Sequence, residues 1–250
     1  MITGTTRSAG YVLTILTLVY LTNFIDRQIL PLLLESIKLE FSLSDAALGL
    51  LSGPAFAFFY AVLGLPMAML ADRFNRRNVI GLSLLLFSIM TMLCGAAGQF
   101  WQLLTARIGT GVGEAGTGPA SQAMISDLYP PEARSRPQAI YATGINLGLL
   151  VAFAGGGFVA QSFGWRAAFL LAGVPGLLLA AILFATVQDP GRGHAAADRD
   201  GLPAPALGEV LRRLWATRLF ASWRWAPPLP ALPAMPWAVS FLLSWNARMA

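Results

Sequence analysis

Apolar stretches long enough to cross a lipid bilayer recur along most of this chain. A helix needs about 20 mostly apolar residues to cross a hydrocarbon core about 30 Å thick. Six stretches meet this requirement when tilt and short interruptions are allowed. They are residues 10–33, 46–71, 78–97, 101–126, 137–161 and 165–187. Because backbone polar groups in lipid must be hydrogen-bonded within the protein, the predicted fold is all-α, an integral membrane bundle of six transmembrane helices.

The composition agrees with a membrane protein and argues against other classes. Hydrophobic residues make up 56% of the chain and charged residues 12%, whereas soluble domains are about 25 per cent charged. The net charge of +5 comes from short basic clusters between the apolar stretches, so no nucleic-acid partner is expected. Cys94 and His194 are each the only residue of their type, which gives no reason to expect a metal or a cofactor. The sequence shows no nucleophile arrangement or cofactor-binding loop, so the chain is not expected to be an enzyme.

The basic residues of the short loops set the expected orientation. Arg73, Arg76 and Arg77 lie on the same side as Arg134 and Arg136 when six spans are threaded through a membrane. Basic residues favour the cytoplasmic side. The prediction is therefore a multi-pass protein of the cell (inner) membrane, with the N-terminus and the segment after the sixth span both in the cytoplasm.

The fourth stretch carries a polar wall inside an otherwise apolar helix. Its polar side chains recur every three to four residues and so share one helical face; they are Arg107, Thr110, Glu114, Thr117, Ser121 and Gln122. A charge at bilayer depth costs about 2.5 to 3.5 kcal/mol on insertion scales, so Arg107 and Glu114 must face water, a partner charge or a substrate. Interspersed glycines favour close helix packing in lipid. We expect a tightly packed helix that lines a cavity, with a structural ion pair as the alternative.

Polar residues also interrupt the first stretch, where Asn23, Asp26 and Arg27 share a face by their spacing. An acid beside an apolar wall has its charged form disfavoured, which suits Asp26 to loading and releasing protons. A plain salt bridge to a neighbouring helix is the alternative for Asp26 or Arg27. Tyr141 and Asn146 are the candidate cavity groups of the fifth stretch. The third stretch contains no charge inside its apolar run, and we expect it to face lipid.

One loop motif resembles that of a known transporter family. The run GLPMAMLADRFNRRN is similar to the loop motif of the major facilitator superfamily, whose charged positions correspond to Asp72, Arg73, Arg76 and Arg77. Ala68 and Asn75 stand at two positions where the superfamily usually has glycine. The phrase GWRAAF, residues 164–169, is similar to the start of the sixth helix in that superfamily. The resemblance implies the N-terminal half of a major facilitator fold.

Further motifs resemble the Spinster branch of the superfamily, which contains lipid transporters and carriers of sugar-like compounds or organic anions. They are Asn75 in the loop motif, NFIDRQ at residues 23–28 and RIGTGVGEA at residues 107–115. Together, the superfamily and branch motifs cover most of residues 10–190. The implied function is secondary active transport of a small organic or amphipathic anion, such as a lysolipid or a sugar acid.

This resemblance also assigns roles to the polar residues. The first and fourth helices would line a central cavity around which two six-helix halves rock. Asp26 would be the proton-coupling acid and Glu114 a second titrating group. Arg107 would pair with these acids or bind the anionic substrate. Further cavity groups would be Arg27, Asn23, Tyr141 and Asn146. Asp72 and its three arginines would form a cytoplasmic latch that closes against a helix of the second half.

The chain changes character after the sixth stretch. We expect a six-helix bundle over residues 1–190, a cytoplasmic linker at 191–206, an amphipathic surface helix at 207–220 and an irregular tail rich in Pro and Trp at 221–250. Clustered prolines in the tail would break a membrane helix. The hypothesis is a frameshift or truncation near residue 221. The expected partners are the lipid bilayer, a small-molecule substrate, and either a missing C-terminal half or a second copy of the chain in a homodimer. The alternative function is that of a non-transporting membrane scaffold or an inactive half-transporter.

Overall fold

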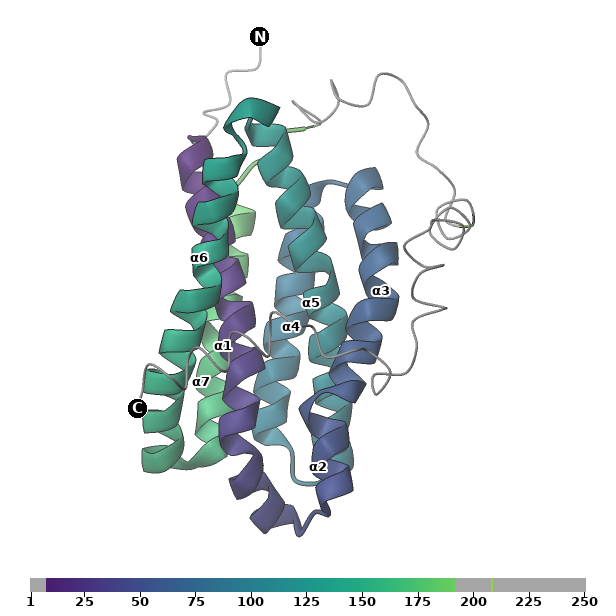
Figure 1. Cartoon of the computed structure of the whole chain (residues 1–250), viewed down its shortest axis with the longest axis vertical. Helices are drawn as coiled ribbons and strands as arrows, with labels where there is room; N and C mark the ends of the chain where they lie inside the picture. Colours follow the sequence, from purple (N-terminus) through teal and green to yellow (C-terminus); the bar gives the residue numbers. More distant parts are fainter. Residues whose placement is uncertain (1–7, 192–207, 209–250) are drawn as a thin grey trace, which may run out of the picture. The chain divides into compact units, whose positions relative to one another are not determined.

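The computed structural model describes residues 8–191 and Gly208, and its helices are shown in Figure 1. The chain divides into two units, residues 1–200 and 201–250, and all of the helices described below lie in the first. The predicted surface helix and Pro/Trp-rich tail lie outside the described residues apart from Gly208, and so does the predicted linker apart from Gly191.

The described part of the chain consists of helices and short turns, without a strand. Its elements are α1 (Ala9–Phe41), α2 (Asp45–Ser52), α3 (Pro54–Arg73), α4 (Arg76–Ala96), α5 (Phe100–Leu128), a short 3-10 helix (Pro131–Ala133), α6 (Ser135–Val151), a π-helical segment (Ala152–Gly156) and α7 (Gly157–Thr186). This arrangement confirms the predicted all-α membrane fold.

Four stretches are long and apolar enough to cross a membrane: Ala9–Phe41, Asp45–Arg73, Arg76–Ala96 and Ser135–Thr186. The last of these contains a break at Gly164, whose φ of 83° is left-handed and favours glycine. The chain reverses direction there, at the lower end of the view in Figure 1. α5 is not among the four, because its glycines and charged side chains lower its mean hydropathy. The count of six spans therefore stays a prediction.

Capping side chains fix where several helices begin. Ser8 accepts a hydrogen bond from the backbone N–H of Tyr11 at the start of α1, and Ser44 accepts one from Ala47 at the start of α2. Asn75 accepts one from Asn78 at the start of α4, at 3.2 Å. Each side chain satisfies a backbone donor that has no partner within its helix. The asparagine that replaces the usual glycine of the loop motif is thus the N-cap of α4.

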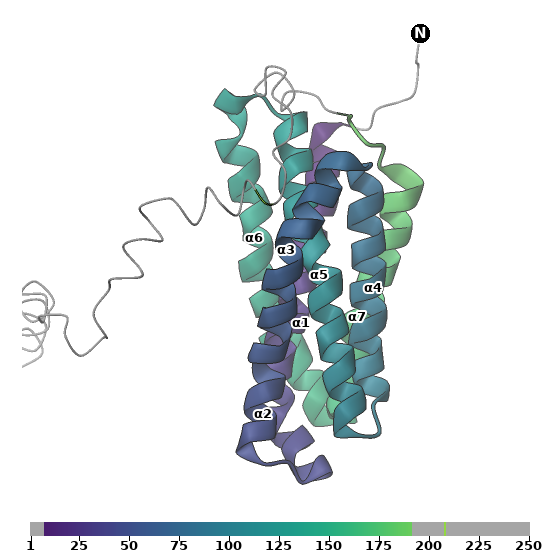
Figure 2. The same cartoon turned by 90° about the vertical axis from the view of Figure 1, so that its right-hand side faces the viewer.

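The prediction that the third stretch faces lipid fits only one side of it, where Leu82, Ile89 and Leu93 are exposed. More than half of the most apolar window of α4 is buried, 56%, against 6% for the stretch that contains α3. α4 packs against α5 and α7, whereas α3 lies at the edge of the bundle against α5 (Figure 2). An uncharged helix suits a protein interior as well as it suits lipid, so the absence of charge could not decide between the two.

Glycines permit the close packing of α5 against α4 and of α6 against α1. A Cβ atom at Gly113 would lie 2.5 Å from the backbone nitrogen of Phe87 on α4. A Cβ atom at Gly148 would lie 2.7 Å from the carbonyl oxygen of Leu21 on α1. Side chains cannot approach a backbone so closely, so these helices meet only because the residues are glycine. The predicted tight packing of the fourth stretch is confirmed.

The turn at Gly164 is held to the end of α1 by charge-assisted hydrogen bonds. Glu40 accepts hydrogen bonds from the Trp165 indole and from Arg166, both at 2.6 Å. Arg166 also donates to the carbonyl oxygen of Ala97, which follows α4. Three parts of the chain are therefore joined at this end of the bundle.

Candidate functional site

A fully buried ion pair joins α1 to α5. A terminal nitrogen of Arg107 lies 2.6 Å from Oδ2 of Asp26, and their side chains are 3% and 0% exposed. The other carboxylate oxygen of Asp26 accepts a hydrogen bond from the Thr91 hydroxyl of α4 at 3.0 Å. Nε of Arg107 is buried without a hydrogen-bond partner among the described residues, so the pair is only partly satisfied. Asp26 thus connects three helices.

A second ion pair lies on the same two helices. Nε of Arg27 lies 2.8 Å from Oε1 of Glu114. The Glu114 side chain is 3% exposed, but that of Arg27 is 29% exposed. The second carboxylate oxygen of Glu114 has no hydrogen-bond partner among the described residues. This pair therefore keeps one free acceptor and one partly accessible cation, unlike the first.

Asn23 holds the two helices together beside these pairs. Its amide nitrogen donates to the Thr117 hydroxyl at 2.7 Å, and Thr117 donates to the backbone oxygen of Glu114. The structure therefore brings five of the predicted residues into one polar cluster between α1 and α5; they are Asn23, Asp26, Arg27, Arg107 and Glu114.

The two candidates from the fifth stretch differ in position. Tyr141 is buried, and its ring stacks on Tyr20 of α1 with centroids 4.4 Å apart and planes 12° apart. Asn146 is exposed on α6. Tyr141 thus belongs to the contact between α1 and α6, and Asn146 is not drawn into it.

Sequence reasoning missed Thr91 and the aromatic residues around Arg27. Thr91 lies in the stretch that was expected to face lipid. The guanidinium carbon of Arg27 lies 5.4 Å from the ring centroid of Phe24, 5.3 Å from that of Phe56 and 4.8 Å from that of Tyr60. Aromatic residues are common in membrane helices, so only their position next to a charge distinguishes these rings. The hydroxyl of Tyr60 within an apolar stretch was the one sequence feature that could have pointed to this aromatic group.

Two arginines of the loop motif have partners on neighbouring helices of the bundle. Arg76 is buried and forms an ion pair with Asp127 of α5, and its backbone N–H donates to Asp189. Arg77 donates to the carbonyl oxygen of Phe184 on α7 at 2.8 Å. Two arginines of the motif therefore tie α4 to its neighbours, and Asp127 is a partner that sequence reasoning missed.

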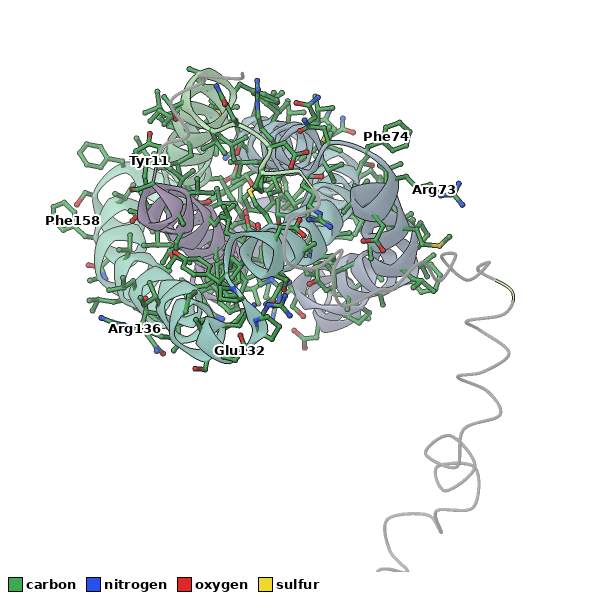
Figure 3. The ribbon with its side chains drawn as sticks, turned by 90° about the horizontal axis from the view of Figure 1, so that it is seen from above. Tyr11, Arg73, Phe74, Glu132, Arg136 and Phe158 are labelled. Atoms are coloured by element: carbon green, nitrogen blue, oxygen red, sulfur yellow. The ribbon has the colours of Figure 1, made fainter. Side chains whose placement is uncertain are left out.

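The other two residues of the motif lie at the end of α3. Asp72 is half-buried, whereas Arg73 is exposed and points away from the helices together with Phe74 (Figure 3). An open hollow of about 260 Å³ lies beside them, lined by Ala71, Arg73, Phe74, Asn75, Arg76, Asp189 and Gly191. Of the four motif residues, Arg73 is thus the one most available to another surface.

Comparison with known proteins agrees with this arrangement. The sequence profile of the Major Facilitator Superfamily matches residues 16–248. This chain belongs to the major facilitator superfamily. The match continues past residue 221, near which the sequence changes character. Membership of this superfamily makes the chain a multi-pass protein of a lipid bilayer.

Individual members of the superfamily show the resemblance to the Spinster branch. A bacterial homolog of the human lysosomal transporter Spinster, solved in an inward-facing and unoccupied conformation, is 37% identical with a TM-score of 0.71. The alignment covers 88% of this chain and 51% of that one. Protein spinster of Drosophila melanogaster is 27% identical over 215 residues, 86% of this chain and 35% of that protein. The resemblance to the N-terminal half of a Spinster-like protein is confirmed.

Another relative carries a different name. An MFS-type efflux pump of Mycolicibacterium smegmatis is 38% identical over 181 residues, which are 72% of this chain and 42% of that pump. This chain spans about half or less of the length of these relatives.

Proposed function

We propose that this chain supplies the N-terminal half of a proton-coupled secondary transporter for a small organic or amphipathic anion. The observation that carries the proposal is the pair of acids, each with its own arginine, buried between α1 and α5. Ionisable groups at membrane depth are costly and usually mark ion or substrate pathways. A relative named as a probable galactarate/D-glucarate transporter of Bacillus subtilis is 29% identical over 186 residues, which supports a sugar acid as one substrate class; a lysolipid is the other.

Proton coupling follows from the unequal surroundings of the two pairs. When Asp26 takes up a proton, Arg107 loses its charged partner while Thr91 can still hydrogen-bond the neutral acid. Glu114 lies seven residues further along the same face of α5 and has a free oxygen, so it is the acid to which Arg107 can turn. An exchange of partners favours one conformation over another, because a ligand shifts an equilibrium through unequal affinity for its states.

Substrate binding is assigned to Arg27, the only cation of the two pairs that is partly exposed. Its guanidinium group can hold a carboxylate or phosphate, and the surrounding Phe24, Phe56 and Tyr60 rings suit the apolar part of an amphiphile. Asn146, exposed on α6, is a further candidate contact. The proposed protein lies in the cell membrane, has no catalytic activity and has both termini in the cytoplasm. Asp72 and Arg73 would close against a second half or a second copy of the chain.

The test is uptake of a sugar acid and of a lysolipid into vesicles that contain the purified chain, with and without a proton gradient. We expect gradient-driven uptake that Asp26→Asn lowers by about tenfold or more, which corresponds to about 1.4 kcal/mol or more of lost stabilisation. Asp45→Asn is the matched control, because Asp45 is an exposed acid at the turn after α1. Absence of flux under every gradient would instead favour the alternative, a membrane scaffold or an inactive half-transporter.

A further inference from the structure

The Phe56 ring of α3 is shared by the two ion pairs. The guanidinium carbon of Arg27 lies 5.3 Å from its centroid and that of Arg107 lies 5.5 Å from it. Cations within about 6 Å of an aromatic face are attracted by its negative charge density, more strongly where water is excluded. One side chain of α3 therefore contacts the cation of the Asp26 pair and the cation of the Glu114 pair.

The ring is held firmly on its own side. Tyr60, one turn later on α3, stacks nearly parallel to Phe56, at 5.8 Å and 12°. α5 approaches the Phe56 backbone at Gly111, where a Cβ atom would lie 3.0 Å from the Phe56 carbonyl oxygen and 3.3 Å from the ring. The ring thus lies between Tyr60 of its own helix and the backbone of α5.

The outer side of α3 is open. Only 6% of the apolar window in its stretch is buried, against 56% in the windows of α1 and α4. α3 packs mainly on α5, so it can shift more easily than a helix enclosed on several sides. The contact at Phe56 is therefore well placed to influence where α3 lies.

We propose that Phe56 is a positioning residue through which the charge state of Asp26 and Glu114 sets the position of α3. The inference rests on the proposed partner exchange between the two pairs. When an acid is neutral, its arginine loses the ion pair. The cation–π contact with the Phe56 ring then contributes a larger part of the arginine's remaining favourable interactions. Because the ring belongs to α3 and stacks on Tyr60 of the same helix, rearrangement of either arginine acts on the position of that helix.

Other charged or titratable groups surround the same region. They are Asp26, Arg27 and Tyr20 on α1, Tyr60 on α3, Cys94 on α4, Arg107 and Glu114 on α5, and Tyr141 on α6. To isolate the two acids from these groups, the test neutralises them by substitution at constant pH.

The test measures the distance between α3 and α4 with a pair of spin labels. Val62→Cys on α3 and Leu82→Cys on α4 are exposed labelling sites, introduced together with Cys94→Ala into the full chain in lipid nanodiscs. We expect Asp26→Asn or Glu114→Gln to move the distance distribution by about 1 to 2 Å, a displacement typical of helix shifts. Phe56→Leu should abolish this response, and Phe56→Tyr, which keeps the ring, should restore it.

Phe58→Leu is the matched control, because Phe58 is an aromatic residue of the same helix with 62% of its surface exposed. It should leave the response unchanged. Gly111→Ala provides a second perturbation if Phe56→Leu does not fold, since its methyl group would crowd the Phe56 carbonyl oxygen and ring and should also weaken the response. An equal helix shift with and without the Phe56 ring, or equal effects of Phe56→Leu and Phe58→Leu, would overturn the inference.

The measurement needs no transport, so it separates this inference from the proposed function. An α3 response that depends on Phe56 in a chain without uptake would leave the positioning role intact and refute transport. Uptake that depends on Asp26 but has the same pH profile in the unsubstituted chain and in Phe56→Leu would support transport and refute the positioning role of Phe56.

Discussion

At the scale of single residues, the centre of this protein is a set of charges that cancel in pairs. Asp26 neutralises Arg107 in full burial, and Glu114 neutralises Arg27 nearer to the surface. Removing one member of a buried pair leaves the other uncompensated, whereas removing both leaves an apolar contact. Stability and charge coupling can therefore be separated by comparing single and double substitutions.

We expect Arg107→Leu to lower the free energy of unfolding by about 3 to 5 kcal/mol, because it leaves Asp26 charged and buried without its partner. The double variant Asp26→Leu with Arg107→Leu should recover most of that loss. Thermal unfolding of the purified variants in detergent measures both. If the double variant is as unstable as the sum of the single ones, the two residues do not act as a pair.

The sequence was sufficient to select the charged residues of the site, because a charge in an apolar stretch is conspicuous. It could not pair them one to one: Asp26 was left open between a proton site and a salt bridge, and Arg107 was set against both acids without a choice between them. Nor could it find Thr91 or Phe56, since a hydroxyl and a phenyl ring are ordinary in membrane helices. Their part in the site depends on which helices become neighbours, and that is a property of the fold.

At the scale of elements, the helices are organised by where they can approach closely. α5 meets α4 at Gly113, and α6 meets α1 at Gly148. The glycines of the fourth stretch predicted that α5 packs tightly, but not which helix it would meet. The burial of much of α4 was missed for the same reason, because its own glycines, such as Gly95 against the carbonyl oxygen of Arg166, do not reveal which helix they meet.

Gly113→Ala should therefore separate α4 from α5. The added methyl group would lie 2.5 Å from the nitrogen and 2.8 Å from the Cα of Phe87, so backbone must move. We expect a loss of about 1 to 3 kcal/mol, as for overpacking in a close-packed core. Gly118→Ala is the control on the same helix, since its nearest neighbour would be the Tyr60 hydroxyl at 3.9 Å. Equal midpoints of thermal unfolding for the two variants would contradict this view of the interface.

At the scale of the whole molecule, each end of the bundle is tied by an arginine paired with a carboxylate. One end carries the arginines of the loop motif, with Arg76 on Asp127. The other carries Glu40 with Trp165 and Arg166. The excess of arginine at the first end is the basis for placing it in the cytoplasm.

That orientation can be tested by labelling intact cells with a membrane-impermeant maleimide. In a Cys94→Ala background, Leu39→Cys lies at the Glu40 end and Phe74→Cys at the arginine end, at positions that are 72% and 63% exposed. We expect Leu39→Cys to react from outside, and Phe74→Cys to react only after the cells are permeabilised. The opposite pattern would invert the predicted topology.

The pairing of Arg107 with Asp26 also bears on how the chain is made. α5 is too polar to count among the helices that can cross a membrane by length and hydropathy, and the acid that neutralises its arginine lies 81 residues earlier. Because α1 is translated first and carries the counter-charge of Arg107, we expect insertion of α5 to depend on α1. A lesion in the first helix should then appear as a failure of the fourth predicted span to insert.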